Sequence, residues 1–530
     1  MRKRSLNLFI RSSGAKVGIH KPSLNAAMAN CYFFALGMLK GVSYILDYLK
    51  QKPNLVFWLI VLINIAFRTF GTDASSIYLD EGQTMFQAKR TIAEIIEDYV
   101  MKQQNAPLYF ILVHFWIKLF GLSVFTVRFF SVLMMALAGG FFFKLSKKLV
   151  SWPFAILCSI LFLGVNDFMY YAHEARGYAL IAFLCSASFY SLYSLLISGK
   201  RKWAYFLTLT SIALLYTHYL TIYIFLVQGL SVLIHLAFYR NTSTFLKYVF
   251  SQLAAAALFA PWLGVVFSVM PEKGDFWITE PTWNLLKNTY YYMIDGRLKT
   301  HWFFGILIGL LIIRNFWAQN RAKEQVLKLL LLIMWAFIPV IVNFFIGFHI
   351  PVFLAKYTFY ATLGFILLSA YLLYTTFSST LVGAILVLAM SFFAFKSLKW
   401  ESNKGEDWKN AVAHVKRLSN NNTLIIGQRF YTYKAFYIYY DLDFFASTDK
   451  PFIEGESKNI FFRENADDTK RLVTNKSPKH VVYFRAHWKG NDRNGAVKAY
   501  LDSEFELISE KKYTFRSNKE TIGVYEYRRP

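Results

Sequence analysis

Apolar runs long enough to cross a bilayer recur along the chain from about residue 54 to about residue 397. A hydrocarbon core of ~30 Å needs roughly 20 apolar residues in a helix. We expect spans at 54–70, 125–146, 152–170, 178–197, 203–217, 219–239, 248–269, 302–314, 327–348, 352–375 and 380–396. The pattern therefore predicts a polytopic α-helical membrane protein with about 11 transmembrane helices.

The pattern changes after residue 400. Residues 423–427 (TLIIG), 480–484 (HVVYF) and 521–527 (TIGVYEY) are typical of strands, and residues 407–417 have helical periodicity. We expect residues 400–530 to form a small soluble α/β domain. Residues 54–399 then form the membrane domain, preceded by a basic segment at 1–53.

Composition supports a membrane protein and affects how the net positive charge is interpreted. The chain has 56% hydrophobic and 17% charged residues, whereas soluble domains have roughly 45–50% apolar and about 25% charged residues. Lys and Arg outnumber Asp and Glu by 58 to 32, a formal net charge of +26. The basic residues cluster between apolar runs, where they orient a chain against anionic lipid, so we expect no nucleic-acid partner.

The basic clusters also predict a topology. The segment 1–53 and the clusters at 144–148, 200–202, 240–247 and 314–328 should be cytoplasmic. Residues 28–49 are interpreted as an interfacial helix, with an extra span as the alternative. If residues 107–121 crossed the membrane, the basic cluster at 144–148 would lie outside the cell. We therefore expect residues 107–121 to lie along the outer membrane surface, within a first outer loop at 72–124. The C-terminal domain is then extracytoplasmic. A small α/β domain after the last span favours a bacterial inner membrane.

This topology places the residues that could take part in chemistry on the outer face of the membrane. Asp80 and Glu81 follow the first span in SIYLDEGQ. Neighbouring carboxylates on a helix differ in direction by ~100°, so only one can face a reacting atom. The alternative is a solvated acidic pair that begins an amphipathic helix at 82–99.

Two further motifs carry cations. In YYAHEARGYAL, Arg176 has a planar fork suited to phosphate oxygens, although an Arg–Glu pair closing a tight loop explains it too. In PVFLAKY, Lys356 could contact a lipid phosphate or extend to the headgroups. The other outer-face candidates are His173, Glu174, Tyr178, Tyr357, His218, Arg128 and Asn105, the last of which a helix cap would also explain.

Cofactor motifs are scarce. His173, Glu174, His218 and Asp80 could converge, but the sequence has no closely spaced His/Cys ligand motif. It also has no Walker loop, dinucleotide-binding glycine fingerprint or nucleophile elbow, which excludes ATP- or NAD-driven chemistry. No cofactor is assigned, and a divalent metal ion stays open.

The motifs form an ordered series: an acidic pair, PLYFILVHFWIKLFG, FTVRFFSVLMMALAG, HEARGYAL and PVFLAKY. Over residues 54–375 this series resembles the GT-C superfamily of polyprenyl-phosphate-sugar glycosyltransferases. The similar branch, glycosyltransferase family 39-like, holds protein O-mannosyltransferases, the lipid A aminoarabinose transferase and galacturonosyltransferases. The tail from residue 407 resembles the extra domain that many bacterial members carry.

The resemblance implies a role for several residues. Asp80 matches the catalytic acidic position and Glu81 its partner, while Arg176 falls at an Arg-x-Tyr position. Lys356, before Tyr357, stands where many relatives have arginine. A phosphate contact there would therefore come from a single ammonium group and not from the planar fork of a guanidinium. Asn105 stands where a histidine is often found, and the oligosaccharyltransferase signature is absent.

We therefore expect a hexosyl or pentosyl transferase that moves sugar from a polyprenyl-phosphate donor to a hydroxyl of a glycan, glycolipid or protein. Asp80 would act as base with inversion, and Arg176, Lys356 and Tyr357 would hold the phosphate. Aromatic residues of the 270–301 loop would stack on sugar or lipid, or form an interfacial belt; they are Phe276, Trp277, Trp283, Tyr290, Tyr291 and Tyr292. The alternative is a flippase or transporter of lipid-linked sugars, for which the chain lacks the usual internal repeats.

Overall fold

The computed structural model describes residues 44, 47–101, 105–268, 278–294, 298–317, 322–400, 406–487, 492, 494–513 and 521–530. The chain divides into two units, Met1–Val56 and Phe57–Pro530, and the elements below lie in the second unit apart from the first turn of α2. Most of the predicted interfacial helix at 28–49 lies outside the described residues.

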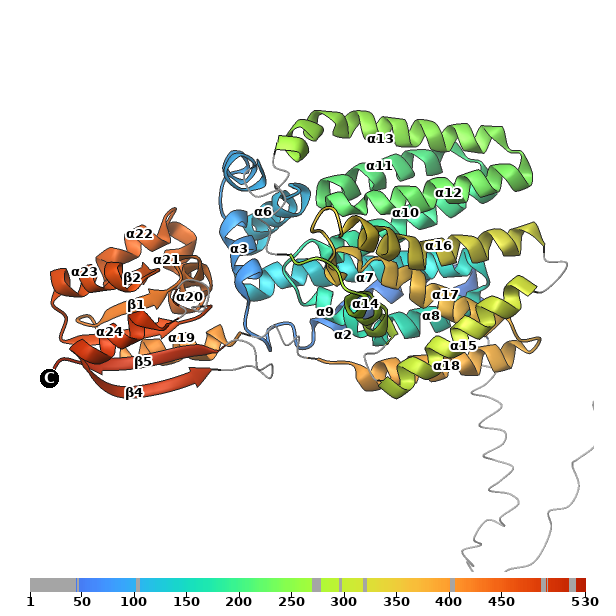
Figure 1. Cartoon of the computed structure of the whole chain (residues 1–530). Helices are drawn as coiled ribbons and strands as arrows, with labels where there is room; N and C mark the ends of the chain where they lie inside the picture. Colours follow the sequence, from blue (N-terminus) through green and yellow to red (C-terminus); the bar gives the residue numbers. More distant parts are fainter. Residues whose placement is uncertain are drawn as a thin grey trace, which may run out of the picture. The chain divides into compact units, whose positions relative to one another are not determined.

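Each predicted span overlaps an α-helix, because long apolar runs without competing polar periodicity favour helix in a nonpolar setting. The predicted span at 352–375 is α-helical only from Ala361, and its first part is loop and the 3-10 helix that carries Lys356 and Tyr357. The helices are α2 (Pro53–Thr69), α7 (Val124–Leu149), α8 (Trp152–Gly164) with α9 (Asn166–Ala172), α10 (Tyr178–Ser198), α11 (Arg201–Thr217), α12 (Ile222–Tyr239), α13 (Thr242–Ser268), α15 (Leu298–Trp317), α16 (Lys323–Ile346), α17 (Ala361–Thr375) and α18 (Thr380–Ser397) (Figure 1).

Fewer helices meet a strict criterion for crossing a membrane. Among the described residues, six are long and apolar enough, or seven if α8 and α9 form one span bent by 62°. Helices α2 and α17 are shorter apolar helices, of 17 and 15 residues. The total of about 11 spans therefore stays a prediction.

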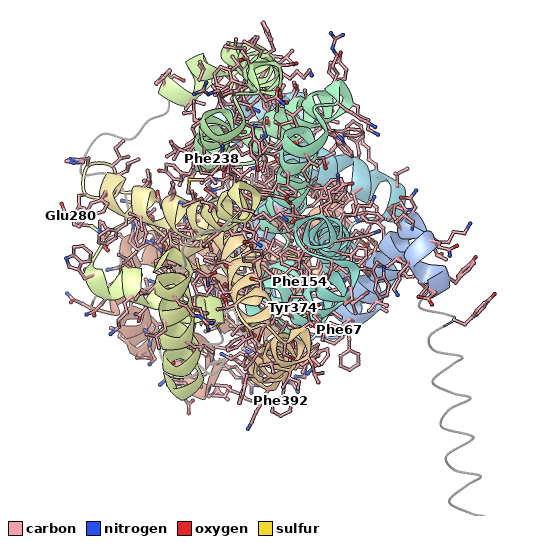
Figure 2. The ribbon with its side chains drawn as sticks, turned by 90° about the vertical axis from the view of Figure 1, so that its right-hand side faces the viewer. Phe67, Phe154, Phe238, Glu280, Tyr374 and Phe392 are labelled. Carbon is pink, nitrogen blue, oxygen red and sulfur yellow. The ribbon has the colours of Figure 1, made fainter. Side chains whose placement is uncertain are left out.

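The helical bundle is packed around α10 and α17, whose side chains are almost all buried. Aromatic contacts join helices that are distant in sequence. Phe189 stacks on Trp335 with ring centroids 3.8 Å apart. Phe154 contacts Tyr374 at 5.2 Å (Figure 2). At the rim, α18 exposes large apolar side chains such as Phe392, which Figure 2 shows at the edge of the bundle. Such exposed apolar surface fits a lipid environment.

The segment 72–124, which the sequence predicts to be the first outer loop, contains short helices: α3 (Leu79–Ala88), α4 (Ile92–Glu94), the π-helix η1 (Ile95–Val100) and α6 (Leu108–Phe120). The sequence predicted one amphipathic helix at 82–99, and this was wrong. Thr91 accepts from the backbone N–H of Glu94, whose side chain bonds back to Thr91, and this capping box starts a second helix. The break leaves α3 as a separate ten-residue helix that carries Asp80 and Glu81.

The C-terminal domain contains a five-stranded sheet of order β2-β1-β3-β5-β4. Strands β1 (Leu424–Gln428), β2 (Ile460–Arg463) and β3 (His480–Arg485) are parallel, while β4 (Glu506–Tyr513) and β5 (Ile522–Arg528) pair antiparallel. Alternate residues of β1 and β3 face two separate cores. Helices α19 (Trp408–Leu418) and α20 (Tyr433–Tyr440) contribute to one core, and α23 (Ala466–Lys476) and α24 (Ala496–Glu504) to the other.

Short helices complete the described chain: α14 (Trp283–Ile294), η2 (Tyr219–Thr221), η3 (Ala355–Thr358), η4 (Phe430–Thr432), α21 (Leu442–Ser447), α22 (Pro451–Glu454) and η5 (Gly455–Lys458). The predicted strands at 423–427, 480–484 and 521–527 and the helix at 407–417 are confirmed within one or two residues. Strands β2 and β4 and the helices between strands were not predicted.

Candidate active site

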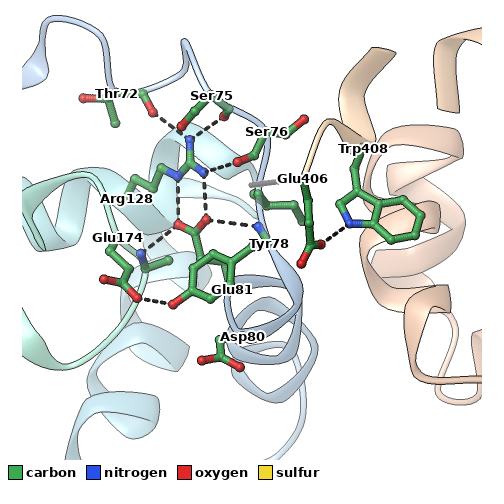
Figure 3. Close-up of polar contacts among 12 residues, drawn as sticks. Thr72, Ser75, Ser76, Tyr78, Asp80, Glu81, Arg128, Glu174, Glu406 and Trp408 are labelled. Atoms are coloured by element: carbon green, nitrogen blue, oxygen red, sulfur yellow. Dashed lines mark hydrogen bonds and ion pairs between the residues drawn. The ribbon is translucent and has the colours of Figure 1, made fainter. Parts of the chain in front are cut away.

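The two neighbouring carboxylates in the first turn of α3 point in different directions, as helix geometry requires (Figure 3). Glu81 is fully buried and forms a two-point ion pair with Arg128 of α7: Nε lies 2.9 Å from Oε1 and Nη2 lies 2.8 Å from Oε2. Asp80 lies on the other side of the helix, away from Arg128, and its side chain is 42% exposed. Only Asp80 is therefore accessible to a substrate.

Arg128 also organises the loop that precedes α3. Its guanidinium donates to the carbonyl oxygens of Thr72 and Ser75, at 2.9 and 2.8 Å, and to that of Ser76 at 3.1 Å. A charged side chain inside an apolar helix must find such partners. The loop wraps around the guanidinium, and this fixes where α3 begins.

The HEARGY turn between α9 and α10 is joined to the same centre. The backbone N–H of Ala175 donates to Glu81 Oε1 at 2.9 Å, and the Ser131 hydroxyl donates to the carbonyl oxygen of Glu174 at 2.6 Å. The Tyr78 hydroxyl donates to the Glu174 carboxylate. Glu81 thus connects three segments, and Glu174 is held beside it.

His173 is fully buried on the far side of this turn. Its Nε2 donates to the carbonyl oxygen of Arg68 at 2.7 Å, which joins the end of α9 to the end of α2. His173 therefore has a structural contact with the end of α2.

The exposed side of Asp80 faces cations. Lys356 Nζ, in η3, lies 3.6 Å from Asp80 Oδ2, and the lysine side chain is 31% exposed. Arg176 is half-buried, with its guanidinium carbon 5.9 Å from the ring centre of Phe110 in α6. The structure brings these three predicted residues into one region, together with Tyr357, whose ring centre is 5.8 Å from Lys356 Nζ.

His218 lies next to these cations, between α11 and η2. Its ring centre is 5.1 Å from that of Tyr357 and 6.5 Å from that of Tyr178. Burial first, and then the positive charges of Arg176 and Lys356, lower the pKa of His218 to about 4. Its Nδ1 accepts from the backbone N–H of Leu220 at 3.2 Å, so the neutral ring carries its proton on Nε2.

Two tyrosines at the site stay protonated. Burial, followed by the negative charges of Glu174 and Asp80, raises the pKa of Tyr78 well above its ordinary value. Burial also raises the pKa of Tyr357, with a smaller opposing effect from Arg176. Both hydroxyls can therefore donate hydrogen bonds at neutral pH.

The remaining candidates have other surroundings. The carbonyl oxygen of Asn105 accepts from the Tyr219 hydroxyl at 3.1 Å, which joins the start of α6 to η2. Trp283 begins α14, is 68% exposed and contacts Phe344 at 4.9 Å, whereas Tyr290 packs against Phe337. Phe276 and Trp277 lie outside the described residues.

The described residues contain no cluster of side chains typical of a protein metal site. Within them, no group of three or more His, Cys, Asp or Glu side chains is arranged to hold one. His173 bonds to a backbone carbonyl, His218 accepts a backbone N–H, and Asp80 pairs with a lysine. The candidate set is therefore engaged in other interactions.

Sequence reasoning missed Tyr78 and Ser131 and did not pair Arg128 with Glu81. The available signal was Arg128 itself, because a charged residue one turn into an apolar run requires a buried partner. Nothing in the sequence indicated which of several acids that partner would be.

No protein-family model and no curated protein matches the chain. Among solved structures, the chain is similar to ArnT from Cupriavidus metallidurans bound to undecaprenyl phosphate, with a TM-score of 0.53 at 11% sequence identity. The similarity covers 89% of this chain and 97% of that chain. This chain has a GT-C fold.

Other similarities of this chain to solved structures are weaker. ArnT from the same organism in the apo state gives a TM-score of 0.48 at 12% identity, covering 89% of this chain and 97% of that one. The Archaeoglobus fulgidus oligosaccharyltransferase gives 0.45 at 11% identity, covering 80% and 69%. The predicted fold class, a polytopic α-helical membrane protein of the GT-C type with a C-terminal α/β domain, is confirmed.

Proposed function

We propose that this protein is an integral-membrane glycosyltransferase. It moves a sugar from a polyprenyl-phosphate donor to an acceptor hydroxyl at the outer face of the membrane, with inversion. The observation that carries the proposal is the pairing of an exposed carboxylate, Asp80, with Lys356 at 3.6 Å, in a region where Arg176 adds a second cation. The GT-C fold supports it.

The reaction needs one base and one anion site. The acceptor oxygen attacks the anomeric carbon, its proton passes to Asp80, and the bond from that carbon to the phosphate oxygen breaks. The electron pair leaves with the polyprenyl phosphate. Because a single displacement occurs, the configuration at the anomeric carbon inverts.

The anion site consists of Arg176, Lys356 and the polar groups beside them. Negative charge grows on the phosphate as the bond breaks, and positioned cations in a partly dehydrated site stabilise it strongly. Lys356 is near enough to Asp80 for one ammonium group to contact the base and the leaving phosphate in turn. His218 adds an N–H donor without a third positive charge, because its pKa is about 4.

Glu81 has a supporting role in this proposal. Its carboxylate is enclosed by Arg128 and by the Ala175 N–H, so it positions the α3 turn and the Arg176 turn relative to each other. The orientation of the chain across the membrane, with its N-terminus in the cytoplasm and its C-terminal domain outside, follows from the charge distribution and is part of the proposal.

The test uses purified full-length protein in detergent with a panel of undecaprenyl-phosphate hexoses and pentoses and a lipid and glycan extract as acceptor. Wild-type protein should consume a donor and release undecaprenyl phosphate, measured by mass spectrometry. Asp80→Asn should reduce this at least about a hundredfold, since general-base catalysis contributes about 10²–10⁴. Asp73→Asn, an exposed acid of the same loop, is the matched control and should behave as wild type.

Arg176→Ala should raise the donor KM, and Arg176→Lys should restore part of the affinity. The proposal fails if wild-type protein consumes no member of the panel, or if Asp80→Asn turns over like Asp73→Asn. A flippase would consume no donor in detergent and would move it only across a sealed bilayer.

A further inference from the structure

Helix α20 of the C-terminal domain packs directly on α3, the helix that carries Asp80. The two helices meet at Gly82, where a Cβ atom would lie 3.4 Å from both the backbone nitrogen of Ala435 and Cβ of Lys434. Gly82 is itself buried. A Cβ atom would therefore just reach van der Waals contact with α20, two residues after Asp80, and a longer side chain would press against it.

Polar contacts fix the register of this junction. The backbone N–H of Ile77 donates to the Tyr439 hydroxyl oxygen at 2.9 Å, and the backbone N–H of Lys409 donates to Ser76 Oγ at 2.7 Å. Lys434 Nζ donates to Gln83 Oε1. These bonds hold the residues just before α3 and the second turn of the helix.

The far end of α3 is held as well. Lys89 Nζ donates to the backbone carbonyl oxygens of Phe445 and Thr448. The ring of Phe86 packs against Tyr433 at 5.9 Å and Phe445 at 6.2 Å. The contact thus runs along the whole helix and combines apolar packing with directed hydrogen bonds.

Ser76, in the loop before α3, is bonded to both domains. Its carbonyl oxygen accepts from Arg128 of the membrane domain, while its hydroxyl accepts from Lys409 of the C-terminal domain. Asp80 lies four residues further along the chain, in the first turn of α3. The direction of its carboxylate therefore depends on contacts from both domains.

We infer that the C-terminal domain is a working part of the transfer reaction, in which Tyr439 and Lys434 are positioning residues that set the orientation of Asp80. This inference rests on the proposed function. Displacing a catalytic group by about 1 Å can cost about a hundredfold in rate, so loosening α3 should lower kcat. The donor KM should change little, because Ser131 of α7 also holds the Arg176 turn and Lys356 lies in η3.

Three variants loosen the junction to different degrees. Tyr439→Phe removes the oxygen that accepts from Ile77 and keeps the ring, Lys434→Met removes the ammonium group and keeps the stem, and Gly82→Leu forces the helices apart. We expect kcat to fall about threefold to tenfold for the first two and about a hundredfold for the third, with donor KM within about twofold of wild type. Lys434→Arg should restore most of the loss, and Tyr500→Phe, in α24 of the same domain, is the matched control.

A second measurement does not depend on turnover. Hydrogen–deuterium exchange of the peptide that spans residues 76–88 should be faster in Tyr439→Phe than in wild type and unchanged in Tyr500→Phe. Faster exchange together with a lower kcat at constant KM supports the inference. The inference is overturned if the three junction variants keep the wild-type kcat. This outcome counts when wild type is active and Asp80→Asn is inactive in the same assay. Unchanged exchange in Tyr439→Phe would also overturn it, whereas an inactive wild type would instead refute the proposed function.

Discussion

Replacing Arg128 by leucine removes the centre of the buried network around Glu81. Both side chains of this ion pair are 0% exposed, and the guanidinium makes two bonds to the carboxylate and three to backbone carbonyls. Leucine is apolar and can fill part of the space. It supplies none of these five hydrogen bonds.

The expected loss in the free energy of unfolding depends on the groups that stay buried without a partner. Breaking a buried ion pair by removing one partner costs about 3–5 kcal/mol, because the other charge is left uncompensated. The three carbonyl oxygens each lose a donor, at roughly 1–3 kcal/mol for a group that stays unsatisfied, although entering water would recover some of this. We expect a loss of at least about 3 kcal/mol in the free energy of unfolding.

The sign of a double variant tests the cause. Arg128→Leu combined with Glu81→Gln removes the unpaired charge, so the double variant should be more stable than Arg128→Leu alone despite having fewer charged groups. Thermal unfolding in detergent gives the order, since 1 kcal/mol shifts the midpoint by about 2–4 °C in a domain of 150–250 residues. Arg201→Leu, at an exposed helix start, is the control.

Two results would refute this reasoning. One is a midpoint for Arg128→Leu equal to that of Arg201→Leu, which would mean that water or another group replaces the guanidinium at no cost. The other is a double variant less stable than Arg128→Leu, which would mean that the carboxylate is not the source of the penalty.

Three further predictions concern the site and the bundle. Lys356→Met should raise the donor KM at least tenfold while Lys356→Arg restores it, measured by donor titration; equal KM values would contradict a phosphate contact. The folded chain binds a proton at His218 only below about pH 4, whereas the unfolded chain binds it near pH 6.5. Wild type should therefore lose stability relative to His218→Asn as pH falls from 6.5 to 4, and parallel unfolding midpoints across that window would contradict the lowered pKa. Gly364→Ala should destabilise by about 1–3 kcal/mol because its Cβ would lie 2.6 Å from Trp335 Cγ, whereas Gly264→Ala, which has open space, should not; thermal unfolding compares the two, and equal midpoints would show that Trp335 can move aside.

The helices of the membrane domain could be predicted because their signal is local. An apolar run needs only its own backbone hydrogen bonds, so its position is written in consecutive residues. Strand β2 has only four residues and the edge strand β4 is largely exposed, so neither gives the continuous buried run of β1 or β3. The break between α3 and α4 depends on the Thr91–Glu94 capping box, a weaker signal than the surrounding amphipathic pattern.

The sequence singled out several candidate residues that lie near one another in the structure, but it could not predict how they pair. Asp80, Arg176 and Lys356 stand out as charges at the ends of apolar runs, and the structure brings them together. Which of two adjacent carboxylates is buried depends on where Arg128 lies in three dimensions, and spacing along the chain cannot supply that. The junction between α20 and α3 was unpredictable for the same reason, since Gly82 and Tyr439 acquire meaning only when two domains meet.

The hydrogen bond from Ala175 to Glu81 has a consequence for movement around Asp80. It ties the Arg176 turn to the α3 turn through a buried charge, so these two segments should shift together or stay still. Lys356 and Tyr357 belong to η3, a separate short 3-10 helix, so independent movement beside Asp80 should come from that segment.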